Sequence, residues 1–232
     1  MLNMSEKVRR MFADIAGDYD RINSILSFGV HNAWRKKTVL ESGAKKGDHI
    51  LDCATGTGDL AIEFKKTAGS EGYVLGTDFC KEMIEHAPAK AVDEELEIDF
   101  EVADAMNLPY EDNRFDISSI AFGIRNVDDP VISLREMARV VKPGGNVVVL
   151  EFGQPGGFIR IPYRLYSKHV MPAIGGWLSG NKEAYEYLPE TSAKFAAGED
   201  FLALMDEAGS FTKRRAVKCT GGIAYIYVGS VK

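Results

Sequence analysis

Residues 51–61 read LDCATGTGDLA, an apolar strand that passes through a glycine-rich turn into a helix. Glycine lets the backbone approach a ligand closely, and Gly56 and Gly58 lie two residues apart in this turn. The first turn of the following helix offers N–H groups that have no partner within the helix. The stretch therefore predicts a ligand-binding loop at the edge of an α/β sheet.

Strands and helices alternate on both sides of this loop. Strands are expected at residues 49–54, 72–78, 97–103, 115–123 and 146–152, and helices at 60–66, 81–90, 129–140 and 193–208. The KPGG sequence of residues 142–145 predicts a turn. Two strands at residues 211–220 and 223–229 flank a Gly-Gly hairpin signal, so the last strand should be antiparallel to its neighbour. We predict a Rossmann-like α/β fold with a seven-stranded, mostly parallel sheet and one antiparallel C-terminal strand.

The 232 residues, 45% of them hydrophobic, fit a single domain, 1–232. We divide it into an N-terminal helical cap (1–47), a cofactor-binding core (48–152), a lid insertion (153–192) and a C-terminal helix with a hairpin (193–232). The insertion is predicted because proline, glycine and tyrosine interrupt the strand–helix alternation there.

Composition excludes several classes of protein. The three cysteines lack metal-ligand spacing, so we expect reduced thiols and no metal site. No apolar run reaches 18 residues, and the N-terminus does not resemble a secretory signal. The net charge of −6 argues against nucleic acid as a partner. These features favour a cytoplasmic protein.

Asp78 ends the second strand, 22 residues after Gly56. Because ligands of such sheets lie beyond the carboxyl ends of the strands, the loop and Asp78 should face one crevice, where a carboxylate can accept both hydroxyls of a ribose. GTGDLA also satisfies the G-x-G-x-x-A pattern of dinucleotide-binding proteins. A nicotinamide-dependent oxidoreductase therefore stays open as an alternative.

Three features favour S-adenosylmethionine as the cofactor. Asp52 lies inside the first strand, where it can fix the loop and face the ammonium group of the ligand. Asp104 ends the third strand, where it can reach an adenine amino group while Met106 packs on the ring. The chain also ends in a hairpin rather than in a second mononucleotide-binding half. A methyltransferase is the leading interpretation.

Two segments resemble a known family. Residues 19–34, YDRINSILSFGVHNAW, resemble YDxMNxxxSxxxHxxW, the N-terminal signature of the ubiquinone/menaquinone biosynthesis C-methyltransferase family. Residues 139–151, RVVKPGGNVVVLE, look like its second signature, and residues 122–126, FGIRN, match another typical segment. With AYEYL at 184–188, the resemblance covers nearly the whole chain.

The resemblance implies the class I S-adenosylmethionine methyltransferase fold and methylation of a ring carbon of a polyprenylated hydroquinone, giving menaquinol or a ubiquinol precursor. Cofactor contacts of the family would fall on Thr57, Asp78, Asp104 and Ala105. With the residues considered above, the predicted cofactor-binding set is Asp52, Gly56, Thr57, Gly58, Asp78, Asp104 and Ala105.

Three departures from the family pattern bear on the site. Ile22 replaces the usual Met, and Ala121 stands where many members have a cofactor-contacting Ser. Residues 153–155 read Gly-Gln-Pro in place of Ser-Lys-Pro. The last change leaves the contacts on the quinone side open, but not the chemistry. Because the choice of acceptor depends on residues of the insertion, another small-molecule acceptor, such as a phenol oxygen or a sterol-like carbon, remains an alternative.

Four residues are catalytic candidates. Arg125 and Asn126 follow the fourth strand, where a guanidinium could stabilise a developing oxyanion and an amide could orient a ring hydroxyl. Tyr19 and His31 could close over the methyl group and help the proton to leave. Alternatively, Arg125 forms a solvated ion pair with Asp128 or Asp129, and Tyr19 and His31 are packing residues. A non-catalytic cofactor-binding module is the remaining alternative.

A polyprenylated quinol lies in a bilayer, so contact with the inner face of the membrane is a further expectation. Within residues 158–170, Arg160, Arg164 and Lys168 recur every four residues and would form one basic helical face. An ordinary surface helix is the alternative. The expected partners are the quinol, with a membrane surface and a homodimer as possible additions.

Overall fold

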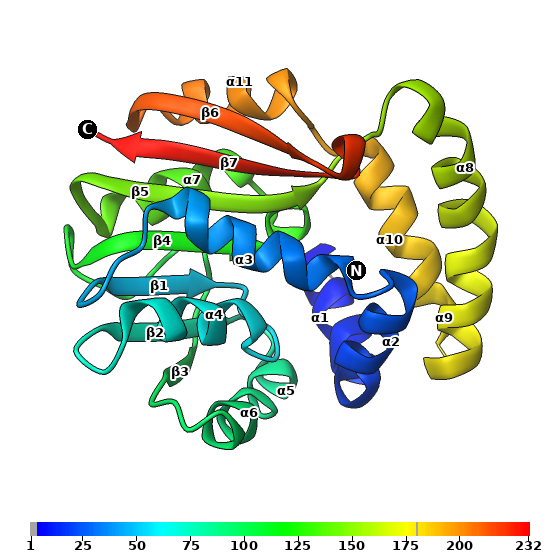
Figure 1. The fold of residues 1–232 in the computed structure, drawn as a ribbon, viewed down its shortest axis with the longest axis horizontal. Coiled ribbons are helices and arrows are strands. Elements are labelled where there is room, and N and C mark those ends of the chain that lie inside the picture. The colour runs from blue at the N-terminus through cyan, green and yellow to red at the C-terminus, as the bar shows by residue number, and fades with distance from the viewer. Residues whose placement is uncertain (1–3, 180) are drawn as a thin grey trace.

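The computed structural model describes residues 4–179 and 181–232. One seven-stranded sheet runs through it in the order β3-β2-β1-β4-β5-β7-β6 (Figure 1). The strands are β1 (His49–Cys53), β2 (Tyr73–Asp78), β3 (Asp99–Val102), β4 (Phe115–Ala121), β5 (Val141–Phe152), β6 (Phe211–Cys219) and β7 (Ala224–Val231). β7 is antiparallel to both β5 and β6, while the pairs from β3 to β5 are parallel. The predicted fold, with its single antiparallel strand, is confirmed.

Helices cover both faces of the sheet. Successive residues of a strand point to opposite faces, and Ile50 and Leu51 accordingly belong to different core clusters. One cluster packs the sheet against α3 (Val30–Ser42) and α4 (Asp59–Ala68), and the other packs it against α7 (Pro130–Arg139) and α11 (Glu199–Ala208). The central strands are therefore buried on both sides, which explains their nearly continuous apolar sequence.

Several predicted boundaries are wrong for local reasons. The helix expected at 81–90 is two helices, α5 (Lys81–Ile84) and α6 (Ala87–Asp93), because Pro88 favours the first turn of a new helix. The turn expected at 142–145 lies within β5 and does not precede it. Val141 pairs with Phe115 and Asn146 pairs with Ile117, so β5 has extra residues between these two pairs. The helix expected at 193–208 begins only at Glu199, after the positive-φ residue Gly198.

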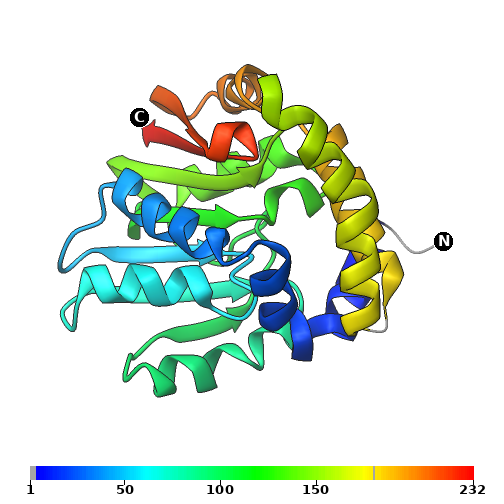
Figure 2. The same cartoon turned by 45° about the vertical axis from the view of Figure 1, so that its right-hand side comes forward.

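A helical layer stands beside the carboxyl edge of the sheet (Figures 1 and 2). Its first part contains α1 (Met4–Ile15), the short η1 (Ala16–Asp18) and α2 (Tyr19–Leu26). Its second part contains η3 (Gly157–Ile159), α8 (Arg160–Leu165), η4 (Tyr166–Val170), α9 (Met171–Ser179) and α10 (Lys182–Lys194).

The two parts of this layer share a small core. Ile22 and Leu26 of α2 pack with Ile15 of α1 and with Tyr185 of α10. Gly175 lets α9 approach α10 closely, since a Cβ on it would lie 2.3 Å from the Tyr185 ring. The N-terminal helices and the insertion are therefore packed together over one edge of the sheet. Within the described residues, no helix has the length and apolar character needed to cross a bilayer.

Candidate functional site

A cavity of about 270 Å³ lies where the parallel strands end. Its walls come from the segments that follow β1, β2, β3 and β4, at the point where the strand order reverses between β1 and β4. Ligands of doubly wound sheets bind at such a reversal. We call it the sheet cavity; Gly56, Asp78, Asp104, Ala105 and Asn126 are among the residues that line it.

Backbone strain marks the floor of the sheet cavity. Gly56 and Gly58 have positive φ, as the glycine-rich sequence predicts. Ala54 and Phe122 also have positive φ, which is unfavourable for residues with a side chain and recurs at ligand sites. Gly123 allows these two turns to touch, because a Cβ on it would lie 2.5 Å from the Ala54 Cβ.

Two acidic side chains are held in place by backbone N–H groups. Asp78 accepts hydrogen bonds from Gly56 (2.8 Å) and Cys80 (2.8 Å), one on each carboxylate oxygen. Asp104 accepts one from Met106 at 2.8 Å. A carboxylate has about four acceptor positions, so each can still receive hydroxyl or amino groups of a ligand.

Three predicted cofactor residues do not line the sheet cavity. Asp52 is buried beneath the loop, where it accepts hydrogen bonds from the hydroxyls of Thr55 (2.7 Å) and Ser119 (2.6 Å). Burial raises the pKa of Asp52 to about 6. The Thr57 hydroxyl donates to Asp20 at 2.6 Å, and Gly58 packs near Phe100. These residues shape the loop from behind.

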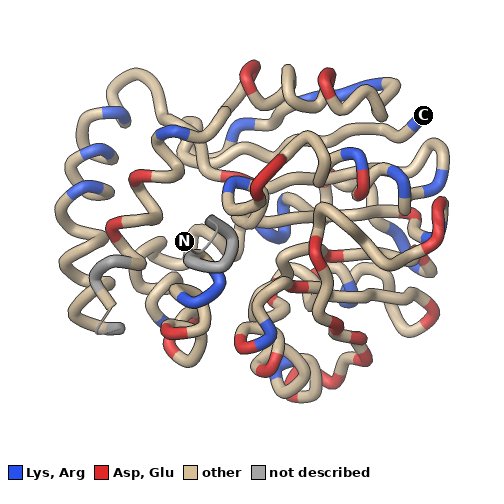
Figure 3. Tube along the Cα trace, turned by 180° about the vertical axis from the view of Figure 1, so that it is seen from behind, with Lys and Arg blue, Asp and Glu red and all other residues tan. Residues whose placement is uncertain are grey.

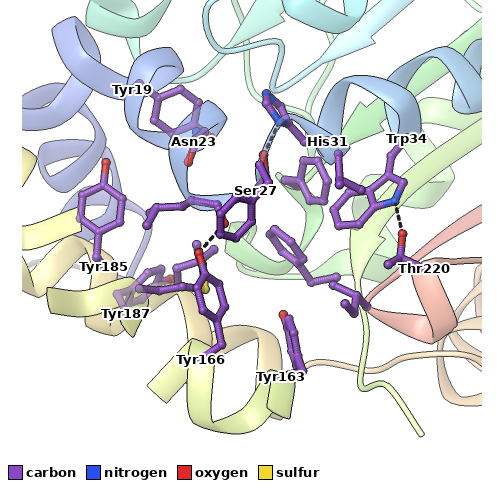
Figure 4. A pocket seen from close by; sticks show the side chains of 18 of the residues that line it. Tyr19, Asn23, Ser27, His31, Trp34, Tyr163, Tyr166, Tyr185, Tyr187 and Thr220 are labelled. Carbon is purple, nitrogen blue, oxygen red and sulfur yellow. Dashed lines mark hydrogen bonds between the residues drawn. The ribbon is translucent and has the colours of Figure 1, made fainter. Parts of the chain in front are cut away.

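A second cavity, of about 450 Å³, lies between the helical layer and the sheet edge. Aromatic side chains dominate its lining, including Tyr163, Tyr166 and Tyr185 from the insertion and Trp34 from α3 (Figure 4). The Trp34 indole donates to Thr220 at 2.9 Å, and Tyr166 donates to the Leu26 carbonyl at 2.6 Å. We call it the cap cavity, and its character suits a flat apolar molecule.

Among the described residues, three side chains belong to both cavities: Phe12, Tyr19 and Phe122. The Phe12 and Tyr19 rings pack edge to face, with 6.0 Å between the ring centroids. Phe122 stacks at a tilt on Phe152, 4.4 Å away. Molecules in the two cavities would thus meet across a wall of single side chains.

Arg125 lines the cap cavity and is bound by Glu151. Its Nη1 atom lies 2.7 Å from Glu151 Oε1 and 2.6 Å from the Phe122 carbonyl oxygen. The side chains are only 4% and 1% exposed. The solvated pair with Asp128 or Asp129 considered from the sequence is therefore replaced by a buried pair with the end of β5.

The other catalytic candidates divide between the cavities. Asn126 lines the sheet cavity, and its Oδ1 accepts a hydrogen bond from Tyr187 at 3.2 Å. Burial raises the pKa of Tyr19, although Arg125 and Arg35 oppose this.

His31 lines only the cap cavity. Its Nδ1 lies 2.5 Å from the Ser27 hydroxyl. Burial, and then Arg35, lower its pKa to about 4, so its ring is neutral at pH 7.

Two buried polar atoms that belong to residues of the cap cavity have no hydrogen-bond partner in the described part of the chain. They are Arg125 Nε and the Tyr185 hydroxyl. A buried donor left unpaired costs about 1–3 kcal/mol. An oxygen-bearing ligand in the cavity would remove this cost.

Residues 1–231 match the ubiE/COQ5 methyltransferase family. The chain belongs to this family. It is 57% identical, over 98% of its length and 97% of the relative, to the ubiquinone/menaquinone biosynthesis C-methyltransferase UbiE of Bdellovibrio bacteriovorus. It is 42% identical, over 97% and 92% of the two chains, to the demethylmenaquinone methyltransferase of Staphylococcus aureus.

Solved structures support the same fold. A methyltransferase of Thermotoga maritima, described as a possible histamine N-methyltransferase, has a TM-score of 0.68 at 20% identity, covering 96% of this chain and 99% of that one. An S-adenosylmethionine-dependent methyltransferase of Aquifex aeolicus has a TM-score of 0.64 at 21% identity, covering 85% and 89%.

Family membership confirms the predicted enzyme class. The chain is an S-adenosylmethionine-dependent C-methyltransferase of the quinone-biosynthesis family, and the nicotinamide alternative is discarded. No group of three or more His, Cys, Asp or Glu side chains within residues 4–179 and 181–232 could hold a metal ion. All three cysteines are buried free thiols.

Sequence reasoning missed parts of the site. Phe12 was not singled out, although it lines both cavities. Glu151 is not among the predicted site residues, although it fixes Arg125. Its position at the end of β5, next to β4, was the available signal, because β4 leads directly to Arg125.

Proposed function

We propose that the protein transfers the methyl group of S-adenosylmethionine to a ring carbon of a polyprenylated hydroquinone, converting demethylmenaquinol to menaquinol. The wall shared by the two cavities is the observation that supports this most directly. A cavity at the strand ends that contains Asp78 and Asp104 meets an aromatic cavity at three side chains, Phe12, Tyr19 and Phe122. Methyl transfer requires the acceptor carbon to contact the methyl group in line with the sulfur atom, so the two molecules would have to meet between these side chains.

The sheet cavity fits the methyl donor. Asp78 would hold the ribose hydroxyls, Asp104 the adenine amino group, and the positive-φ backbone at Gly56 would allow close approach of the methionine part. The bound donor supplies a sulfonium methyl group. Asp52 lies under the loop, and its negative charge would favour a cationic ligand there.

The cap cavity would orient the hydroquinone. Its aromatic side chains would hold the ring flat against the shared wall, and Arg125 Nε and the Tyr185 hydroxyl offer partners for ring oxygens. A phenol has a pKa near 10, so its ring carbon becomes nucleophilic when the phenolate is stabilised. The guanidinium of Arg125, kept in place by Glu151, would provide that stabilisation.

The chemical balance is simple. The ring carbon forms a bond to the methyl carbon, the bond between sulfur and methyl breaks, and the ring loses one proton to restore aromaticity. Tyr19 in the shared wall, and Asn126 on the sheet-cavity side of it, could orient the reacting hydroxyl. Neutral His31, beside Ser27, could pass the proton away from the cavity.

A radiolabel assay tests the acceptor. Purified protein would be incubated with methyl-labelled S-adenosylmethionine and either reduced demethylmenaquinone or a reduced demethoxy-benzoquinone. Label on a ring carbon of the naphthoquinol is the expected result. Transfer only to the benzoquinol, or only to an oxygen atom, would contradict the proposal.

We also propose that the insertion meets a membrane surface. Phe158, Ile161 and Leu165 are 90%, 70% and 58% exposed, and their spacing of three and four places them on one face of the helical segment. Large apolar side chains gathered on a surface mark a contact site.

Basic side chains run beside this apolar face. Arg160, Arg164 and Lys168 are all exposed, and the basic positions form a line along the segment in Figure 3. Apolar side chains next to cations suit an anionic bilayer, although the chain as a whole carries a charge of −6. Phe28, which lines the cap cavity and is 81% exposed, lies beside Tyr166 of the same segment and would face lipid at the cavity mouth.

A further inference from the structure

A charged cluster joins four separate elements behind the glycine-rich loop. Lys90 of α6 binds Asp20 of α2 at 2.6 Å, and it also binds Asp59, the first residue of α4. Arg35 of α3 pairs with Asp59 at 2.9 Å. Acids and bases therefore alternate in the order Asp20, Lys90, Asp59, Arg35.

The cluster contacts the loop on both sides of Gly58. The Thr57 hydroxyl donates to Asp20 at 2.6 Å and lies 3.1 Å from the Lys90 ammonium. Asp59 follows Gly58 directly. Burial would raise the pKa of Asp59, but Arg35 and Lys90 outweigh it and hold that pKa below its usual range. The carboxylate thus stays charged at pH 7.

The same cluster adjoins the wall between the two cavities. Asp20 is next in sequence to Tyr19, which starts α2 and lines both cavities. Since α2 packs on α9 and α10 through Ile22 and Leu26, a shift of α2 would also move the far side of the cap cavity. The position of the loop and the shape of the cap cavity are therefore linked through Asp20.

We infer that Asp20 is a positioning residue that couples occupancy of the sheet cavity to closure of the cap cavity. Thr57 and Lys90 already join Asp20 to the loop, so a methyl donor that orders the loop would also order Asp20 and set Tyr19 against the acceptor. By linkage, a ligand in either cavity should strengthen binding in the other by the same factor, typically about 5–150-fold. The inference depends on the proposed function only for the identity of the acceptor.

A purely stabilising role of the cluster would have different consequences. A partly exposed ion pair contributes little to stability, and Asp20 and Lys90 are 37% and 29% exposed. If the cluster were only a surface network, its loss would lower stability slightly and leave the two cavities independent. Coupling between the cavities is the property that separates these roles.

Hydrogen exchange of the α2 amides measures this coupling without any acceptor. S-Adenosylhomocysteine, which fills the sheet cavity but cannot react, should slow exchange across residues 19–26 in the wild-type protein. Asp20→Asn keeps the shape of the side chain and removes its charge, and it should abolish most of that slowing. Asp18→Asn is the matched control, because Asp18 lies two residues away and pairs with Arg21 of the same segment, at 3.0 Å.

Kinetics give a second measurement. Asp20→Asn should lower kcat roughly tenfold and reduce the effect of S-adenosylhomocysteine on acceptor binding to about twofold or less. Asp20→Glu should restore part of both. If Asp20→Asn does not fold, Lys90→Gln replaces it and should give the same loss.

The outcomes are distinct. Equal slowing of α2 exchange in the wild type and Asp20→Asn, or equal loss in Asp18→Asn, would overturn the inference. Loss of slowing in Asp20→Asn alone supports it, even if the labelled-donor assay shows no methylation of demethylmenaquinol. That last result would refute the proposed acceptor and leave the coupling intact.

Discussion

Arg125 Nη1 lies 2.7 Å from Glu151 Oε1, and the pair is almost completely buried at the edge of the cap cavity. Glu151 Oε1 also accepts a hydrogen bond from the Phe152 N–H group at 2.8 Å, and Arg125 holds the Phe122 carbonyl. The guanidinium lies over the Phe152 ring, 5.3 Å from its centroid. The pair thus fixes the Arg125 guanidinium next to an apolar cavity. There it could bind a ring oxygen, and its buried contacts keep it from turning toward solvent.

Removing one member of this pair should be more harmful than removing both. Glu151→Gln leaves an uncompensated buried charge and should lower the free energy of unfolding by about 3–5 kcal/mol. The double variant Arg125→Met with Glu151→Met should recover most of that stability, because apolar side chains can replace a buried pair. Denaturant unfolding of the two variants measures the difference.

Activity should not follow stability in these variants. The folded double variant should lose about 10²–10³ in kcat, since the oxyanion loses its donor, while its affinity for S-adenosylmethionine changes little. Turnover close to the wild-type rate in the double variant would remove Arg125 from the catalytic mechanism.

His31 should make the protein acid-sensitive. Its pKa is about 4 in the folded protein and about 6.5 when unfolded, so between these values only the unfolded chain binds the proton. The free energy of unfolding should therefore fall as the pH decreases from 6.5 to 4, by up to roughly 3 kcal/mol at 1.36 kcal/mol per pKa unit. Urea unfolding of the wild type and His31→Gln across this range isolates the contribution. The same slope in both proteins would assign it to other groups.

Gly123 should tolerate no side chain. The methyl group of Gly123→Ala would lie 2.5 Å from Ala54 Cβ and 3.2 Å from Ile120 Cγ1, so the two strained turns must separate. We expect a loss of about 1–3 kcal/mol in unfolding free energy and clearly weaker S-adenosylmethionine binding by calorimetry. Gly156→Ala is the control, because an added Cβ there has no heavy atom within 4 Å. Equal affinity in both variants would show that the turn does not shape the donor site.

Membrane binding should depend on the insertion. Reversing Arg160, Arg164 and Lys168 to Glu should weaken sedimentation with vesicles of mixed neutral and anionic lipid, and Phe158→Ser with Ile161→Ser should weaken it further. The control reverses three exposed lysines elsewhere: Lys45, Lys46 and Lys213. Unchanged binding in the first variant, or equal losses in both charge reversals, would contradict a specific membrane face.

The strands, and the meeting of Gly56, Asp78 and Asp104 at one cavity, could be predicted because their signals are local. Apolar runs with short turns place each strand, and the parallel arrangement brings Gly56, Asp78 and Asp104 to one edge. Helix boundaries were less accurate where a single proline, such as Pro88, starts a new turn. The family resemblance supplied the acceptor class, which no spacing in the sequence encodes.

Side-chain partners could not be predicted in the same way. Sequence proximity favoured Asp128 or Asp129 for Arg125, whereas pairing of β4 with β5 brings Glu151 from 26 residues away. Thr57 is predicted to contact the cofactor, but its hydroxyl donates to Asp20, which belongs to a helix that no local pattern connects to the loop. These contacts depend on tertiary packing rather than on neighbours in the chain.

The size of the cap cavity has a consequence for the quinone pool. A volume of about 450 Å³ is typical of pockets for a compact small molecule, so under the proposed function a long isoprenoid chain would have to pass Phe28 and remain among the lipids. The protein would then contact the quinol ring and only the first part of its isoprenoid chain. We expect one such enzyme to serve quinols of any chain length that a cell makes, leaving that length to be set earlier in their synthesis.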